Sequence, residues 1–129
     1  MSATATQATS AAAHIEVKDL TMAYGSFVIQ HDLTFTINHG DIFIIMGGSG
    51  CGKSTLLRHL NGLMAPAKGA VLYDGTSYWD SPAEEQERIK QSFGMSFQSG
   101  ALWSSLTLAE NVALPLGEYT SLSPAEISE

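Results

Sequence analysis

One stretch, residues 47–55, constrains what this chain can fold into more than any other. It follows a continuous apolar run, residues 42–46, of the kind expected for a strand buried on both faces. It precedes residues 56–60, whose apolar side chains are spaced as in a helix. The pattern G-x-x-x-x-G-K-[ST] is complete from Gly47 to Ser54. A strand, a glycine loop and a helix in this order predict a phosphate-binding loop.

Each part of this loop has an expected role. Glycines allow positive φ angles, and the loop and helix N–H groups then attract phosphate oxygens. Lys53 is expected to neutralise the outer phosphates, Ser54 to ligate Mg²⁺, and Thr55 to donate to the inner phosphates. The predicted nucleotide-binding residues of the loop are Gly47, Gly48, Ser49, Gly50, Cys51, Gly52, Lys53, Ser54 and Thr55.

Composition limits the remaining possibilities. The 129 residues suffice for one small domain, and 44% hydrophobic with 15% charged residues is a globular composition. A net charge of −7 without a basic stripe argues against a nucleic-acid partner. Cys51 is the single cysteine, so it has no disulfide partner in this chain. We expect its alkylation to block nucleotide binding and ATP to protect it; a small residue that the loop merely tolerates is the alternative. No apolar run is long enough to cross a bilayer.

Ahead of the loop, the chain predicts a tail and an antiparallel sheet. Residues 1–13 are almost entirely Ser, Thr and Ala, which indicates a flexible tail rather than a secretory signal. Alternating apolar and polar residues then predict short strands that lie beside a parallel core. These strands are expected at residues 15–20, 21–24, 27–30 and 33–37.

Behind the loop, turn and capping signals punctuate the chain. Pro115 is expected to limit one of the helices. The last capping box has too few residues behind it for a stable helix, so we expect a truncated polypeptide; a frayed terminus with accidental spacing is the alternative. The expected elements are a helix to residue 61, a strand at 69–73 with a tight turn into 77–79, a helix at 82–92, a strand at 93–97, and helices starting at 107–110 and 123–126.

These features together resemble the N-terminal half of an ABC transporter ATPase subunit, from about residue 15 to residue 129. The resemblance rests on the early strands, on Tyr24 followed by glycine, on the loop, and on Gln98 at a predicted strand end. It implies ATP and Mg²⁺ as cofactors, and adenine stacked on Tyr24, for which an ordinary strand tyrosine is the alternative. It also implies that Gln98 contacts Mg²⁺ and the attacking water, so that Lys53 and Gln98 are catalytic and Ser54 and Gln98 are metal ligands.

Residues 97–107 and 110–116 look closest to the ATPases of Mla-type lipid importers, also described as organic-solvent-tolerance ABC systems. This implies transport of phospholipid or another lipid across the inner membrane by a cytoplasmic subunit bound to the membrane's inner face. Its implied partners are a transmembrane permease and a second ATPase subunit. Leu102 and Trp103 are then expected either at the permease interface or in a local helical core.

Other family features are missing. No apolar strand ends in Asp-Glu, the Leu-Ser-Gly-Gly-Gln signature is absent, and Pro124 prevents residues 122–124 from replacing it. His14, His31, His39 and His59 lie at or before the loop helix, where we expect solvated positions rather than a late switch histidine.

The expected fold is therefore an α/β P-loop NTPase fragment of the ABC ATPase type over residues 14–129, with an antiparallel β subdomain and part of a parallel RecA-like core. We expect weak nucleotide binding and negligible hydrolysis by this chain alone. Another P-loop class or a non-catalytic product that binds the permease remain the alternatives.

Overall fold

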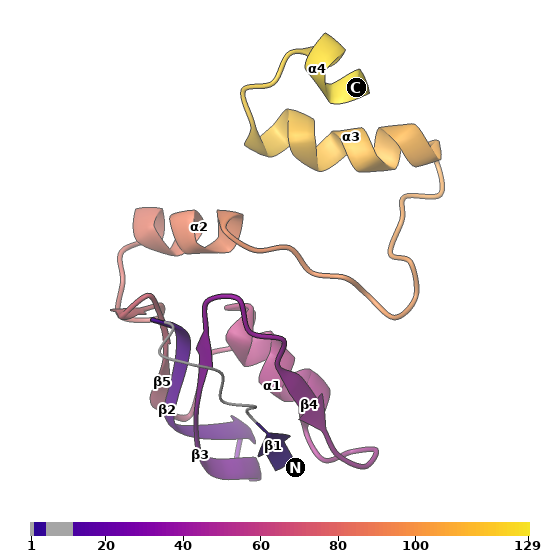
Figure 1. The fold of residues 1–129 in the computed structure, drawn as a ribbon. Coiled ribbons are helices and arrows are strands. Elements are labelled where there is room, and N and C mark those ends of the chain that lie inside the picture. The colour runs from indigo at the N-terminus through magenta and orange to yellow at the C-terminus, as the bar shows by residue number, and fades with distance from the viewer. Residues whose placement is uncertain (1, 5–11) are drawn as a thin grey trace. The chain divides into compact units, whose positions relative to one another are not determined.

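The computed structural model describes residues 2–4 and 12–129 (Figure 1). They belong to two compact units, and the boundary between these units in the chain lies after Lys90. The first unit contains the strands and two helices, and the second contains helices α3 and α4. Most of the predicted tail, residues 1 and 5–11, lies outside the described residues. Of the remainder, Ser2–Thr4 forms strand β1 and Ala13 begins β2.

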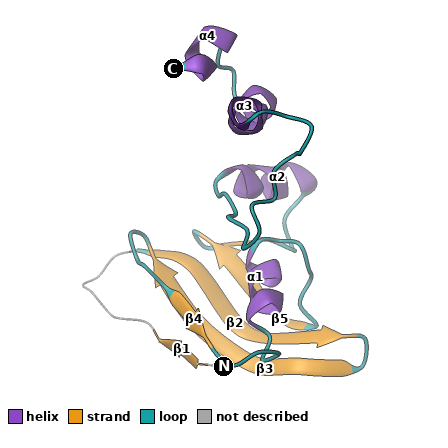
Figure 2. Ribbon diagram, turned by 90° about the vertical axis from the view of Figure 1, so that its right-hand side faces the viewer, coloured by secondary structure: helices purple, strands orange, loops and turns teal. Residues whose placement is uncertain are grey.

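A four-stranded antiparallel sheet with the order β3-β2-β5-β6 forms the body of the first unit (Figure 2). The four short strands predicted at its start are in fact two long ones, because the chain passes through bulges without leaving the sheet. Asp19 and Asp32 take positive φ angles of 47° and 56° within them. The strands are β2 (Ala13–Tyr24), β3 (Phe27–Asn38), β5 (Lys68–Tyr73) and β6 (Thr76–Ser77).

Helix α1 (Lys53–Leu60) packs on this sheet and places the glycine loop beside it. Leu56 and His59 are almost completely buried, and the Tyr73 hydroxyl donates to the Leu60 carbonyl. Burial raises the pKa of Tyr73. His59 was predicted to be solvated, which is wrong, because it lies on the same helical face as Leu56. The buried hydrophobic residues are Val17, Leu20, Met22, Leu56, Leu60, Val71, Tyr73, Tyr78 and Ile89.

Strand β4 (Ile44–Met46) is shorter and more exposed than the apolar run predicted. Ile42 is 92% exposed, and Ile44 and Met46 are more than half exposed. A strand is buried on both faces only when neighbouring strands and covering layers surround it. Among the described residues β4 pairs only with β1, and all strand pairs there are antiparallel, so no parallel core forms within them.

Helix α2 (Ala83–Gln91) follows Pro82, as the capping signal predicted, and buries Ile89. The next predicted element, a strand at residues 93–97, is wrong, since these residues are neither strand nor helix. A strand requires a pairing partner, and apolar alternation alone does not supply one.

The second unit contains α3 (Leu108–Tyr119) and α4 (Pro124–Ser128). Both predicted capping boxes are present, around Thr107 and Ser123. The prediction that Pro115 limits α3 is wrong, because the helix continues to Tyr119. A proline removes one N–H of the helix ladder, and the following turn still forms its own bonds, as when Thr120 N donates to Leu116 O. No helix in residues 2–4 and 12–129 is long and apolar enough to span a membrane.

Candidate functional site

The glycine loop approaches β3 closely at Gly52, where a Cβ would clash with Ile29. Gly52, the N-cap of α1, has a φ of 96°, and a Cβ there would lie 2.7 Å from Ile29 Cγ2. Gly50 also has a positive φ, of 79°, whereas Gly47 and Gly48 are not among the positive-φ glycines, so two of the four loop glycines use this conformational freedom. No side chain caps the helix at Gly52. The first N–H groups of α1 can therefore serve an anion.

Lys53 places its charge over this loop. Its Nζ donates to the carbonyl oxygens of Gly47 at 2.7 Å and Gly48 at 2.8 Å, and lies 3.7 Å from Cys51 Sγ. The Cys51 N–H in turn donates to Gly48 O at 3.3 Å, which closes a tight turn. A cation is thus held at the mouth of the loop by contacts that phosphate oxygens can replace.

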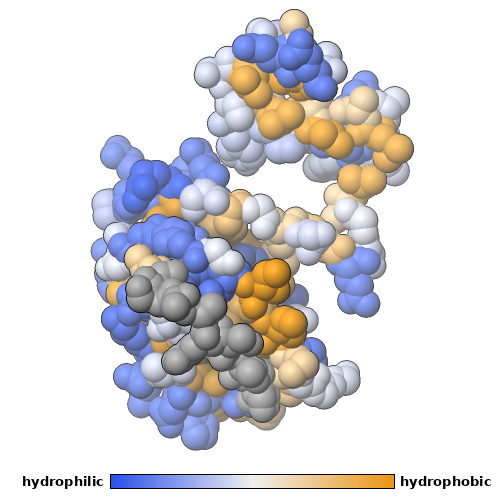
Figure 3. All heavy atoms as spheres, in the orientation of Figure 1, coloured by the Kyte–Doolittle hydropathy of each residue, from blue (hydrophilic) through white to orange (hydrophobic). Residues whose placement is uncertain are grey.

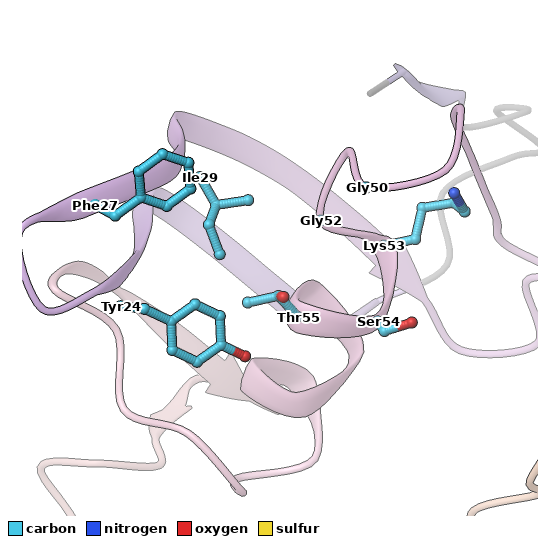
Figure 4. A pocket seen from close by; sticks show the side chains of 8 residues that line it. All are labelled: Tyr24, Phe27, Ile29, Gly50, Gly52, Lys53, Ser54 and Thr55. Atoms are coloured by element: carbon cyan, nitrogen blue, oxygen red, sulfur yellow. The ribbon is translucent and has the colours of Figure 1, made fainter.

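A hollow of about 380 Å³ joins the loop to the sheet (Figure 4). Its volume lies within the usual range of small-ligand sites. One side is aromatic and aliphatic, and the other side offers N–H groups, hydroxyls and an ammonium. Such a lining suits a ligand with a flat ring system and an anionic tail. The lining residues are Tyr24, Phe27, Ile29, Gly50, Gly52, Lys53, Ser54 and Thr55.

Tyr24 is anchored to α1 although its side of the hollow is formed by the sheet. Its ring is 47% exposed, and its hydroxyl accepts a hydrogen bond from Arg58 Nη1 at 3.0 Å. Hydrogen bonds with the Thr55 and Arg58 side chains lower the pKa of Tyr24. The ring is therefore held in place while one face stays accessible in the hollow, as stacking on a ligand requires.

Three further residues complete the site and were not predicted. Phe27 lies opposite Tyr24 in the β2–β3 hairpin, a position that the Gly25-Ser26 turn signal would have revealed. Ile29 is two residues further along β3 on the same face. Arg58 follows Ser54 by four residues, so helical spacing places it beside the loop.

Gln98 belongs to the second unit, in a stretch without helix or strand, and is exposed. Its expected contacts with Mg²⁺ and water stay predictions. Among the loop residues, Ser49 is exposed and lies outside the lining of the hollow, while Ser54 and Thr55 belong to that lining.

Comparisons with known proteins agree with this geometry. The family model described as ABC transporter matches residues 30–128. The chain is 43% identical over 115 residues to the probable ribonucleotide transport ATP-binding protein mkl of Mycobacterium leprae, which covers 89% of this chain and 33% of that protein. It is 41% identical over 108 residues to the intermembrane phospholipid transport system ATP-binding protein MlaF of Haemophilus influenzae, covering 84% and 41%.

Solved structures give the same picture. A dimeric ATP-binding cassette in a post-hydrolysis state with ADP and Pi has a TM-score of 0.76 at 31% identity. The match covers 88% of this chain and 52% of that chain. The chain therefore spans a third to two fifths of these curated relatives and about half of this solved chain.

Proposed function

We propose, since this chain belongs to the ABC transporter family, that it carries the ATP-binding half-site of a transporter's ATPase subunit. The family resemblance and the ABC ATPase fold expected from the sequence are confirmed by the matches to residues 30–128 and to solved cassettes. The observation that carries the functional proposal is the hollow of about 380 Å³ in which an aromatic wall meets a cationic, glycine-lined helix N-terminus.

We expect ATP to bind in this hollow in one orientation. The adenine would stack on Tyr24, with Phe27 and Ile29 as apolar neighbours, because these residues line the side away from the loop charge. The phosphates would then lie against the N–H groups that follow Gly52, where the helix dipole favours negative charge.

The Lys53 ammonium already lies at the glycine loop, where it donates to two carbonyl oxygens. When ATP binds, it would donate to phosphate oxygens instead, with little movement of its charge. Mg²⁺, when bound, would neutralise phosphate charge, and the Ser54 hydroxyl in the lining of the hollow would hold it. Gln98 is proposed as a further contact of Mg²⁺ and of the attacking water.

We propose that the transported substrate is a phospholipid or another lipid, moved across the inner membrane. The proposal is supported by the Mla-like stretch at residues 97–116 and by the relative that is named for phospholipid transport. Another similar protein is named for ribonucleotide transport, so a direct test of cargo must include both classes.

The partners would be a transmembrane permease and a second ATPase subunit, at the inner face of the membrane. Helices α3 and α4 contain no buried residues, and apolar atoms gather on the surface of this unit (Figure 3). Leu102 is 58% and Trp103 66% exposed, so they do not fill a local core. Exposed apolar surface of this kind favours the interface among the two roles expected for these residues.

The proposal is tested by ATP binding to the purified 129-residue chain. Lys53→Ala should weaken binding of a fluorescent ATP analogue at least about tenfold, since it removes a charge-assisted contact. Lys18→Ala, which removes an exposed lysine paired with Glu16 on β2, should leave binding unchanged. Equal effects of the two substitutions would contradict the proposed site, and efficient competition by GTP would favour another P-loop class.

Hydrolysis provides a second test. We expect negligible turnover by this chain alone, because it lacks the Asp-Glu strand, the signature sequence and a late histidine. Rapid Mg²⁺-dependent ATP hydrolysis by the purified chain would show that this expectation is wrong.

A further inference from the structure

Three side chains that can bind a metal ion lie together at one end of the sheet. None of them belongs to the glycine loop. His14 lies at the start of β2, His39 directly follows β3, and Asp74 directly follows β5. The sheet order β3-β2-β5 makes these three strands immediate neighbours. Because the strands are antiparallel, the start of β2 lies beside the ends of β3 and β5. The topology thus brings together residues that are 25 to 60 positions apart in the chain.

The side chains are already in contact. Asp74 Oδ1 accepts hydrogen bonds from His14 Nδ1 at 3.1 Å and from His39 Nε2 at 2.6 Å. The two imidazole rings lie with their centroids 4.1 Å apart. One possible ligand atom from each of the three residues lies within 4.8 Å of the other two.

The backbone fixes these positions independently of the side chains. His39 N donates to Ala12 O at 3.1 Å, and Asp74 N donates to His14 O at 2.8 Å. Asp74 has a φ of 48° in the β5–β6 turn, a conformation that aspartate tolerates better than most residues. Backbone hydrogen bonds therefore join the segments that carry the three side chains. This is the rigid support that a preorganised site requires.

We propose that His14, His39 and Asp74 form a binding site for a divalent transition-metal ion, with Zn²⁺ as the ion that fits it best. Imidazole nitrogens and a carboxylate oxygen are common Zn²⁺ ligands, at about 2.0–2.2 Å from the metal. Tetrahedral bonds of that length separate neighbouring ligand atoms by roughly 3.3 Å. The Asp74 carboxylate oxygen lies 3.1 Å from the His14 nitrogen and 2.6 Å from the His39 nitrogen, and all three ligand atoms lie within 4.8 Å of one another. Small side-chain rotations would bring these separations to the tetrahedral value.

The chemistry of the cluster selects among metals. Two neutral nitrogen donors disfavour Mg²⁺ and Ca²⁺, which prefer oxygen ligands. The cluster supplies three protein ligands, so a water or an exogenous group would complete the tetrahedron. His39 and Asp74 are exposed and His14 is partly exposed, which gives a metal ion access from solvent.

One neighbouring charge opposes a cation here. The Arg88 guanidinium of α2 interacts electrostatically with Asp74. Arg88 also forms a bidentate ion pair with Glu85, which balances its charge. Asp74 would supply the negative charge that compensates a bound metal ion.

The chain contains a matched control. His31 Nδ1 lies 2.7 Å from Asp32 Oδ2 on β3, which is another exposed histidine–carboxylate pair. The groups found within ligand distance of one another in residues 2–4 and 12–129 include no third partner for this pair. Substituting His31 removes another histidine that faces an aspartate, without touching the cluster.

The test is Zn²⁺ binding by the tag-free 129-residue chain, measured by competition with a chromophoric chelator. We expect one Zn²⁺ per chain, an affinity at least about tenfold weaker in His14→Ala and His39→Ala, and unchanged binding in His31→Ala. Asp74→Asn, which suits the same backbone conformation, should also weaken binding and provides a variant that keeps the turn. The Tm should rise with Zn²⁺ in the wild-type chain and in His31→Ala only.

Several results would overturn the proposal. It fails if the wild-type chain binds no Zn²⁺ at stoichiometric concentrations, or if His31→Ala weakens binding as much as His39→Ala. It also fails if binding survives His39→Ala and Asp74→Asn but is lost in Cys51→Ser, because the thiol of the glycine loop would then be the ligand. The far-UV circular dichroism spectrum of each variant reports whether it is folded.

Discussion

The two units of this molecule are stabilised in different ways. The first unit has a core in which α1 contributes Leu56 and His59 against a four-stranded sheet. The second unit has helices without buried residues, held at their starts by capping boxes at Thr107 and Ser123. A packed core gives rigid support to the proposed nucleotide site, whereas exposed helices leave apolar surface available to a partner.

The largest expected effect tests the core of the first unit. Leu56→Ala removes a fully buried side chain from α1 and should destabilise the chain by about 3 kcal/mol, from lost burial and the cavity left behind. Leu108→Ala is the matched change in α3, where the side chain is exposed, and should change stability by less than about 0.5 kcal/mol. Urea unfolding followed by circular dichroism measures both. Similar losses at the two positions would contradict the difference between the units.

A smaller effect is expected where the loop contacts the sheet. Gly52 has a φ of 96°, and an alanine Cβ there would lie 2.7 Å from Ile29 Cγ2. We therefore expect Gly52→Ala to lower the free energy of unfolding by about 2 kcal/mol. Gly94→Ala in the second unit meets no atom within 4 Å and has no positive φ, so it should be nearly neutral. Thermal unfolding of both variants is the measurement, and a neutral Gly52→Ala would show that the loop is not packed against β3.

The smallest expected effect concerns a helix cap. Hydrogen bonds from the backbone and then the side chain of Thr107 lower the pKa of Glu110. A carboxyl group whose folded pKa is lowered stabilises the helix above its unfolded pKa, and this contribution is lost as the pH falls through the lower folded value. We expect amide exchange at the start of α3, corrected for its intrinsic pH dependence, to gain protection as pH rises from about 3 to 5. Glu110→Gln, which removes the titrating carboxyl group, should abolish this gain and leave β2 unaffected; an unchanged gain would contradict the cap.

Local features of the fold were predictable from the sequence. The capping boxes at Thr107 and Ser123 and the turn at Asp74 depend on residues within a few positions of one another. The glycine loop is equally local, since spacing alone places Lys53 at the start of a helix.

Features that depend on distant partners were not predictable. The exposure of Ile42 follows from which strands pair with β4, and the burial of His59 from which face of α1 meets the sheet. Strand β2 continues past Asp19 because a bulge preserves its pairing, which apolar alternation does not encode. At the site, Arg58 contacts the predicted Tyr24 only because α1 lies beside the sheet, whereas the position of Phe27 follows from the local Gly25-Ser26 turn.

The central claim is that Tyr24 and the glycine loop form one nucleotide site. Its most direct test is ATP binding by Tyr24→Ala, with Tyr119→Ala, an exposed tyrosine of α3, as the control. We expect Tyr24→Ala to weaken ATP binding roughly 5- to 100-fold, because about 1–3 kcal/mol of base stacking is lost. Binding of inorganic triphosphate, which has no base, should weaken far less. Tyr119→Ala should bind ATP as the wild-type chain does. Unchanged ATP affinity in Tyr24→Ala would contradict the claim.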